Sequence, residues 1–147
     1  MNLNVKKIPF NKTFVVRHPV LRANRPVEEC YFEGDELPST THFGLFDQDN
    51  LVGVLSVFEN KHPNFNEGKV FQIRGMALLK EYQNKNLGVI LLNKAEAYVN
   101  TQKGTVIWFN AREKAVNFYK KNGFQIKGTL FEIPQIGSHY LMFKQLT

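Results

Sequence analysis

A short polar turn carries the residue types with the clearest chemistry in this sequence. It spans Gln83–Gly88, reads QNKNLG, and lies between a stretch typical of a strand and one typical of a helix. When a strand enters a helix through a tight turn, the first backbone N–H groups of the helix have no partners, and together with the helix dipole they attract an anion. The turn therefore predicts an anion-binding site, although an ordinary helix-entry turn would have a similar sequence.

Two elements must position this turn. The strand before it is expected over Val70–Leu79, which alternates in polarity and is rich in β-formers, and Gly75 within it indicates a bulge or a close backbone approach. The helix after it begins with a run of apolar residues at helical spacing. These residues are Gly88, Leu91, Leu92, Ala95, Tyr98 and Val99. A second apolar strand over Thr105–Ala111 then predicts a right-handed parallel crossover.

The other expected elements follow from periodicity and from the positions of proline and glycine. They are a strand over Asn4–Ile8, an irregular helix over Lys12–Asn24 broken by Pro19, a hairpin of His42–Phe46 and Leu51–Phe58, a second helix over Glu113–Asn122, and a closing strand pair of Phe124–Ile133 and His139–Leu146. Between the irregular helix and the hairpin lies Asn24–Thr41, a loop with five carboxylates that we call the flap. It is either a solvated excursion or a segment that faces a substrate.

Length and composition favour a single globular domain over residues 1–147. The hydrophobic fraction is 43%, and no run approaches the about eighteen apolar residues of a membrane span. The first residues, MNLNVKKIPFNKTF, lack the apolar centre of a signal peptide, which favours a cytoplasmic location. Cys30 is the only cysteine, so no intrachain disulfide is expected, and its thiol is interpreted as a buried group rather than a nucleophile.

The net charge of +6 has several interpretations. A basic surface suits nucleic acid, an acidic membrane surface or a polyanionic small molecule, or it is simply solvated. Basic residues occur in pairs such as Lys6-Lys7 and Lys120-Lys121 rather than in longer runs, and neither a zinc spacing nor an aromatic RNA-binding motif accompanies them. We therefore expect no nucleic-acid partner, no membrane partner and no metal.

Two motifs together resemble the GNAT superfamily of acyl-CoA-dependent N-acetyltransferases. The pyrophosphate loop of that superfamily is written Q/R-x-x-G-x-G/A. Gln83 and Gly88 match its first and last positions, and Asn86 stands where glycine is usual. Because Asn tolerates a left-handed backbone better than most residues, this departure is mild. The second motif, Ala115–Tyr119 followed by Gly123-Phe124, is similar to A-x-x-[LF]-Y-x-x-x-G-F.

The resemblance covers essentially the whole chain and implies its fold. A GNAT fold is α+β (mixed α/β), with a central, mixed, mostly antiparallel twisted sheet that has a splayed parallel strand pair and is flanked by about four helices. Three further stretches resemble an ElaA-like branch of the superfamily. They are Arg17–Arg22, Glu33–Asp35, and Ile133–Gly137 with His139. The acceptors of that branch are poorly defined, so the branch does not name a second substrate.

The resemblance also implies acetyl-CoA as the cosubstrate. Backbone N–H groups of the turn would hold the pyrophosphate, with Lys85 as a screening charge, and the preceding strand edge would pair with the pantetheine amides. A backbone N–H near Met76 or Ala77 would polarise the thioester oxygen. The expected cofactor-binding residues are Met76, Ala77, Leu78, Gln83, Asn84, Lys85, Asn86, Leu87, Gly88, Val89, Asn110 and Tyr119. Asn110 is interpreted equally well as the cap of the helix that follows it.

Catalytic roles follow from the chemistry of amine acetylation. Tyr119 is the candidate general acid for the departing thiolate, because a phenol with a pKa of about 10 is protonated at neutral pH; periodicity alone would make it a core tyrosine. The candidate bases are Glu33, His139 and Glu132, each of which is also open to a purely structural interpretation. Arg74 would pair with a flap carboxylate or bind an acidic acceptor.

These observations predict an N-acetyltransferase that moves the acetyl group of acetyl-CoA to a primary amine by direct attack. The acceptor is a small-molecule or peptide amine that the sequence does not identify. The alternative is a non-catalytic module that binds acyl-CoA and acts as a sensor, and a third interpretation is a basic nucleic-acid-binding domain, which would show a steep salt dependence. Exposed strand edges are compatible with a homodimer.

Overall fold

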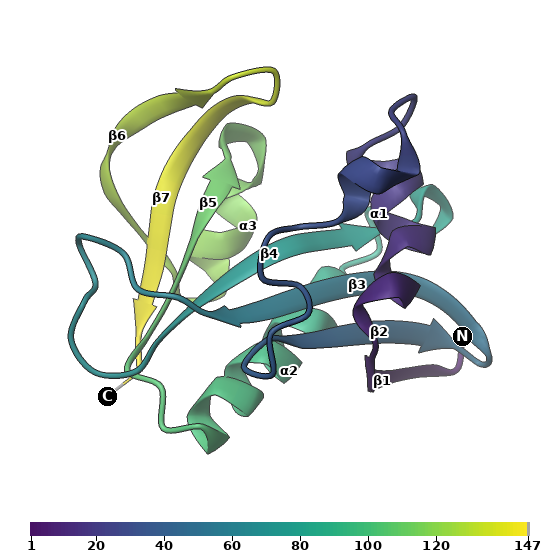
Figure 1. Cartoon of the computed structure of the whole chain (residues 1–147), viewed down its shortest axis with the longest axis horizontal. Helices are drawn as coiled ribbons and strands as arrows, with labels where there is room; N and C mark the ends of the chain where they lie inside the picture. Colours follow the sequence, from purple (N-terminus) through teal and green to yellow (C-terminus); the bar gives the residue numbers. More distant parts are fainter. Residues whose placement is uncertain (147) are drawn as a thin grey trace. The chain divides into compact units, whose positions relative to one another are not determined.

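The computed structural model describes residues 1–146, and this range contains seven strands and three α-helices (Figure 1). The strands are β1 (Leu3–Ile8), β2 (Thr41–Asp47), β3 (Asn50–Glu59), β4 (Val70–Leu78), β5 (Val106–Arg112), β6 (Gln125–Ile133) and β7 (Gly137–Gln145). The helices are α1 (Phe14–Leu21), α2 (Gly88–Thr101) and α3 (Val116–Lys121). Short 3₁₀ helices occupy Phe10–Thr13, Val27–Cys30, Lys80–Tyr82 and Glu113–Ala115. The strands follow the order β1-β2-β3-β4-β5-β7-β6 in one sheet.

Strand β4 supplies the parallel pairing of the sheet. Its first residues pair in parallel with β5, from Val70↔Val106 to Gln72↔Trp108, whereas the β1–β2, β2–β3, β5–β7 and β6–β7 pairs are antiparallel. The expected mixed, mostly antiparallel sheet with a parallel pair is therefore confirmed. The splay of that pair stays a prediction.

Contacts between residues divide the chain into two compact units. The first unit comprises Met1–Glu59 and Ile73–Tyr98, and the second comprises Asn60–Gln72 and 99–146. Strands β1 to β3 and helix α1 belong to the first unit, and strands β5 to β7 and helix α3 belong to the second. Strand β4 and helix α2 each contribute residues to both. The interpretation as one domain stays a prediction.

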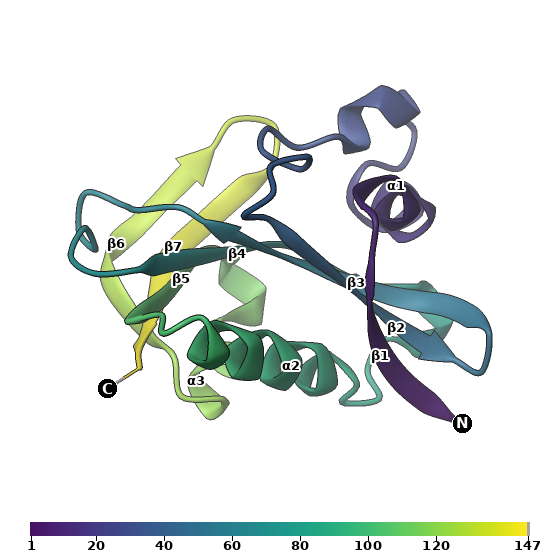
Figure 2. The same cartoon turned by 60° about the horizontal axis from the view of Figure 1, so that its bottom comes forward.

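In the first unit, helices α1 and α2 lie on opposite faces of the strands (Figure 2). On one face, Val16 of α1 packs with Val54 of β3 in a buried apolar cluster. On the other face, the Tyr98 ring of α2 lies 5.6 Å from the ring of Phe43 on β2. Burial of an aliphatic side chain such as Val16 or Val54 stabilises the fold by about 1.5–3 kcal/mol. The alternation of the hairpin strands thus supplies both helices with an apolar surface.

Gly75 interrupts the alternation of strand β4. It has a φ of +66°, and a Cβ atom built on it would lie 2.8 Å from the Phe32 ring and 3.3 Å from Nε of Arg17. On either side of it, Arg74 lies over the Phe32 ring and Ala77 packs with α1, so the two side chains point to the same face of the sheet. In a regular strand, residues three positions apart point to opposite faces. This spacing is that of a β-bulge. The expected close approach at Gly75 is confirmed, and the bulge stays a prediction that this spacing supports.

In the second unit, strand β5 separates two layers of side chains. Trp108 belongs to a buried cluster with Val70, Val106 and Leu141 on one face. Phe109 points to the other face, where its ring lies 4.4 Å from the ring of Tyr119 on α3. Strand β7 pairs with β5 in register from Val106↔Gln145 to Arg112↔His139. Each pair of opposite residues therefore points to the same face of the two strands.

The helices required two corrections. About four helices were expected, but residues 1–146 contain three α-helices, because the central part of the flap forms only the single 3₁₀ turn Val27–Cys30 after Pro26. The second expected helix begins with another 3₁₀ turn. A 3₁₀ helix rotates by a different angle per residue than an α-helix, so its side chains point in different directions from those of a regular α-helix. Helical periodicity places Ala115, Phe118, Tyr119 and Asn122 on one face, but Val116 is the buried residue of α3. None of the helices in the described range is long and apolar enough to cross a membrane.

Candidate active site

The turn before α2 contains a series of backbone donors with no bonded acceptor. Among the residues that the structure describes, no acceptor within the protein is bonded to the backbone N–H groups from Asn84 to Val89. Asn84 and Asn86 have φ angles of 59° and 60°, both in the left-handed region that Asn tolerates. Successive N–H groups in such a backbone form a concave anion site at the start of the helix. The donors expected for an anion site are therefore unbonded in the first unit, and anion binding there stays a prediction.

The base of this turn is fixed by contacts within the first unit. The Gln83 side chain donates from Nε2 to the Leu78 carbonyl oxygen at 2.9 Å. Just before it, the Tyr82 hydroxyl donates to a carboxylate oxygen of Asp47 at 2.7 Å. This hydrogen bond, followed by one from the backbone N–H of Asn2, lowers the pKa of Asp47. Gln83, which matches the first position of the GNAT loop, thus holds the turn through its side chain. The backbone N–H groups of the residues that follow have no bonded acceptor in the described protein.

The three residues expected at the end of β4 have different environments. Ala77 is buried and packs with α1, whereas Met76 and Leu78 are half-buried. The Leu78 carbonyl oxygen already accepts the hydrogen bond from Gln83. A role of the backbone N–H near Met76 or Ala77 toward a thioester stays a prediction.

Tyr119 lies in an aromatic cluster of the second unit. Its ring is 4.4 Å from that of Phe109, 5.2 Å from Phe118 and 6.2 Å from Phe124, between ring centres. Although part of the side chain reaches solvent, the surrounding protein desolvates the phenol, and burial raises the pKa of Tyr119 to about 12. The group is therefore protonated at every physiological pH. Its transfer of a proton to a thiolate of pKa about 8.5 is uphill by about 5 kcal/mol, so a hydrogen bond is its stronger contribution.

Asn110 and His139 lie on the face of the strand pair opposite to Tyr119. Asn110 on β5 is exposed and pairs with Leu141, and the next pair on the same face joins Arg112 to His139. His139 is 4% exposed, and its Nδ1 lies 2.7 Å from the Gly137 carbonyl oxygen. Because a carbonyl only accepts, Nδ1 carries the proton and Nε2 keeps its lone pair.

The two carboxylate candidates are exposed. Glu33 lies on the flap in the first unit and has no hydrogen bond or ion pair among residues 1–146. Glu132, on β6 in the second unit, accepts a short hydrogen bond from the Ser138 hydroxyl. Neither environment singles out a base.

A buried polar network anchors the flap, and the sequence did not reveal it. Arg17 is fully buried and bonds Asp35 through both terminal nitrogens, at 2.7 and 3.1 Å. It also donates to the Cys30 carbonyl oxygen at 2.8 Å and to the Ser56 hydroxyl at 2.9 Å. The hydroxyl lies 2.6 Å from Nδ1 of His42. Within the part of the chain that the structure describes, Nε of Arg17 is a buried donor with no partner.

His42 completes this network as a neutral imidazole. Its Nε2 lies 2.9 Å from the backbone carbonyl oxygen of Asp35, so Nε2 donates and Nδ1 accepts the hydrogen bond from Ser56. Desolvation lowers the pKa of His42, which agrees with this tautomer. In the sequence, only the position of Arg17 beside Val16 on an apolar helix face pointed to this network. An arginine buried there requires a buried carboxylate.

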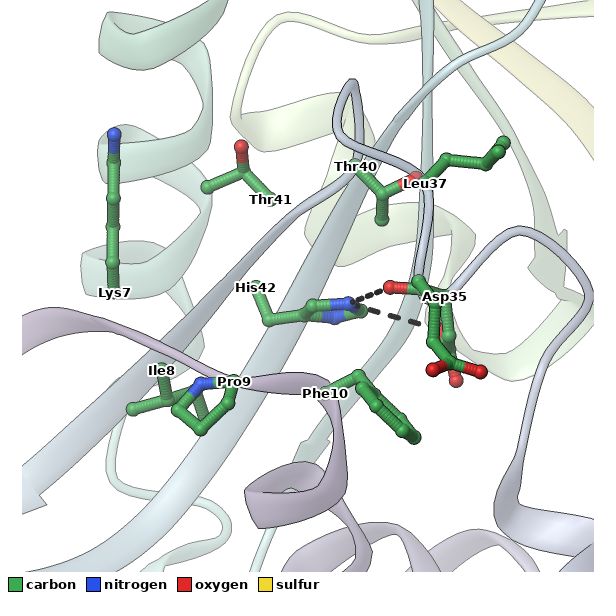
Figure 3. Close-up of a pocket in the computed structure, with 10 residues that line it drawn as sticks. Lys7, Ile8, Pro9, Phe10, Asp35, Leu37, Thr40, Thr41 and His42 are labelled. Carbon is green, nitrogen blue, oxygen red and sulfur yellow. Dashed lines mark hydrogen bonds and ion pairs between the residues drawn. The ribbon is translucent and has the colours of Figure 1, made fainter.

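A pocket of about 390 Å³ opens beside this network in the first unit (Figure 3). It is lined by Lys7, Ile8, Pro9, Phe10, Asp35, Glu36, Leu37, Thr40, Thr41 and His42. The imidazole of His42 lies at its centre and is bonded to Asp35 (Figure 3). His42 is bonded to the backbone carbonyl of Asp35, and the Asp35 carboxylate is bonded to Arg17, so these two residues join the flap to the hairpin at the pocket.

Comparison with known proteins places this geometry in a family. The model of the acetyltransferase (GNAT) family matches residues 10–124. The chain is 32% identical over 144 residues to the uncharacterized N-acetyltransferase YitI of Bacillus subtilis (strain 168), an alignment that covers 98% of this chain and 97% of YitI.

Two solved structures show the same fold. An aminoglycoside 6'-N-acetyltransferase complexed with coenzyme A superposes with a TM-score of 0.77 at 14% identity, covering 97% of this chain and 96% of that one. A GNAT family acetyltransferase from Elizabethkingia anophelis with acetyl-CoA bound gives a TM-score of 0.68 at 12% identity, covering 99% of both chains.

The chain belongs to the GNAT acetyltransferase family. It is an acyl-CoA N-acyltransferase of the GNAT type, as the two motifs indicated. Its assignment to an ElaA-like branch stays a prediction.

Proposed function

We propose that this protein transfers the acetyl group of acetyl-CoA to a primary amine by direct attack of the amine on the thioester. The observation that carries the proposal is the row of unbonded backbone N–H groups from Asn84 to Val89 at the start of α2. These donors suit a diphosphate, and the exposed Lys85 adds a positive charge beside them. The acetyl-CoA bound to a family member of the same fold supports this choice of cosubstrate.

In the proposed reaction a C–N bond forms and the thioester C–S bond breaks. The attacking nitrogen loses one proton, and the departing sulfur either accepts one or leaves as a thiolate stabilised by a hydrogen bond. A lysine-like amine is neutral in only about one molecule in 2,500 at pH 7, so its deprotonation costs about 4.6 kcal/mol. A base near the amine therefore accelerates the reaction unless the acceptor has a low pKa.

His139 is the candidate base whose neutral tautomer the geometry defines. Its Nδ1 donates to Gly137, which leaves Nε2 as the basic atom. Tyr119 lies on the opposite face of the β5–β7 pair and donates a hydrogen bond to the leaving sulfur. Glu33 remains the alternative base from the flap.

Substitution of Tyr119 by Phe tests the catalytic role. Tyr119→Phe keeps the aromatic packing and removes the hydroxyl, so kcat should fall about 100-fold, at the lower end of the range for acid catalysis, with an unchanged Kd for acetyl-CoA. Steady-state kinetics on an amine panel and calorimetric titration of acetyl-CoA measure the two quantities. Tyr140→Phe, which removes a half-buried hydroxyl from β7 in the same unit, is the matched control.

The same measurements separate the enzyme from a sensor. If wild-type protein binds acetyl-CoA but acetylates no amine of the panel, the non-catalytic acyl-CoA-binding module is favoured. If Tyr119→Phe turns over like the wild type, Tyr119 is a packing residue and the departing thiolate is stabilised elsewhere.

A further inference from the structure

Three guanidinium groups surround one phenyl ring in the first unit. The guanidinium carbons of Arg17, Arg74 and Arg22 lie 3.9, 4.7 and 5.5 Å from the ring centre of Phe32. Phe32 is 6% exposed and forms the inner end of the flap. A cation over an aromatic face gains about 0.5–2 kcal/mol, but three like charges around one ring repel one another unless anions compensate them.

Among residues 1–146, only Arg17 of these three arginines forms an ion pair. Asp35 is engaged through both carboxylate oxygens by Arg17. Among residues 1–146, no carboxylate forms an ion pair with Arg22 or Arg74. Arg22 donates from Nη1 to the Leu21 carbonyl oxygen at 3.0 Å. Arg74 therefore interacts with Asp35 and Glu33 only from beyond ion-pair distance, and Arg22 likewise forms no ion pair among the described residues.

Arg74 is the more constrained of these two. Its guanidinium also lies 5.4 Å from the Phe58 ring centre, so two aromatic rings hold it. Burial, followed by repulsion from Arg17, lowers the pKa of Arg74 and outweighs the attraction of Asp35. The expectation that Arg74 pairs with a flap carboxylate is therefore wrong, because the buried flap carboxylate is bound to Arg17 instead.

The position of Arg74 relates this charge to the proposed chemistry. Arg74 precedes Met76 on β4 by two residues, a span of about 7 Å along a strand. Met76 and Ala77 are where a backbone N–H is expected to polarise the thioester. An acceptor whose amine reaches the thioester would therefore place a group three to six bonds away within reach of Arg74.

We propose that Arg74, assisted by Arg22, binds an anionic group on the amine acceptor and thereby selects amines that also carry a carboxylate or a phosphate. The inference rests on the proposed acetyl transfer and names the class of its second substrate. A guanidinium binds either anion through two parallel hydrogen bonds, which an ammonium does not reproduce. An amino acid with a terminal amine is the simplest such acceptor.

Matched acceptors provide the test. Acetylation by the wild type is compared for 4-aminobutyrate, butylamine, putrescine and O-phosphoethanolamine, which present a carboxylate, no charge, a second cation and a phosphate beside a primary amine. We expect kcat/KM for 4-aminobutyrate or O-phosphoethanolamine to exceed that for butylamine and putrescine by about 10- to 100-fold, because hydrogen bonds to charged groups have this strength. The better of the two anions identifies the group.

Variants assign the preference to its residue. Arg74→Gln should lower kcat/KM for the preferred acidic amine about 10- to 100-fold and leave that for butylamine and the Kd for acetyl-CoA unchanged. Arg74→Lys keeps the charge without the paired donors, so its kcat/KM for the acidic amine should lie between those of the wild type and Arg74→Gln. Arg22→Gln should lower this kcat/KM less than Arg74→Gln does. Arg25→Gln is the control, because Arg25 is an exposed arginine of the same segment that pairs with Glu29.

Each contrary result has a separate meaning. Equal or better acetylation of butylamine or putrescine overturns the inference, as does an equal loss for every acceptor in Arg74→Gln. A raised Kd for acetyl-CoA in Arg74→Gln would assign the arginine to a phosphate of the cosubstrate. If the wild type acetylates nothing, the proposed function fails, and titration of N-acetyl-4-aminobutyrate into the CoA-bound protein then decides the inference by whether binding depends on Arg74.

Discussion

The turn Gln83–Gly88 and the flap Asn24–Thr41 are both polar segments of the first unit, but they use their polar groups in opposite ways. In the turn, the side chains from Gln83 to Asn86 are exposed and the backbone donors that follow have no partner in the described protein. In the flap, Asp35 is buried, and its charge is neutralised by Arg17.

The difference shows what a polar residue in a loop can mean. Unsatisfied backbone donors at an exposed helix start are inexpensive in water and are available to a ligand. A buried carboxylate is tolerated only because its partners are already in place, so it positions the chain and does not bind a ligand. Two substitutions and one pH measurement test this contrast.

Removal of Arg17 should have the largest effect. Arg17→Met leaves the Asp35 carboxylate buried without a counter-charge, so the free energy of unfolding should fall by about 3–5 kcal/mol. Urea denaturation measures this loss. The double variant Arg17→Met, Asp35→Leu should recover much of it, because no buried charge is then left alone. A single variant as stable as the wild type would show that the network does not hold the flap.

The left-handed backbone at Asn86 should have an intermediate effect on the turn. Valine at a φ of +60° is strained by about 1–2 kcal/mol, so Asn86→Val should weaken acetyl-CoA binding about 10-fold as the donors lose their arrangement. Asn86→Gly is the matched control and should bind at least as well as the wild type, since glycine adopts this backbone freely. Calorimetric titration gives both Kd values, and equal affinities for the two variants would argue against a cradle of backbone N–H groups.

The pH dependence of stability should show the smallest effect. Because desolvation lowers the pKa of His42 in the folded protein, the unfolded chain binds its proton first as the pH falls through about 6.5. The free energy of unfolding should therefore decrease from pH 7.5 toward pH 5.5, by at most about 1.4 kcal/mol per pH unit, and continue to fall until the folded pKa is passed.

Thermal unfolding at several pH values measures this slope. His42→Gln should flatten it, whereas His62→Gln, which alters a histidine of the second unit, should not. A wild-type Tm that is constant between pH 7.5 and 5.5 would mean that His42 titrates alike in the folded and unfolded chains.

Much of the fold was predictable because its signals are local. Alternation located the hairpin strands to within a residue or two, and the apolar spacing from Gly88 onward predicted both the start and the buried face of α2. The left-handed Asn86 was also expected from residue type alone. Periodicity was less reliable for α3, where a 3₁₀ first turn shifted the face and buried Val116.

The sequence by itself determined the family, the order of the elements and the turn at the start of α2, because each depends on residues that are neighbours in the chain. Which charged side chains are paired within the protein, and which are not, depends on the tertiary structure. Arg17, Asp35, Ser56 and His42 come from four separate segments and satisfy one another only after the fold has brought them together. Among residues 1–146, Arg74 forms no ion pair, and its guanidinium lies over the rings of Phe32 and Phe58, while the buried Asp35 is bonded to Arg17.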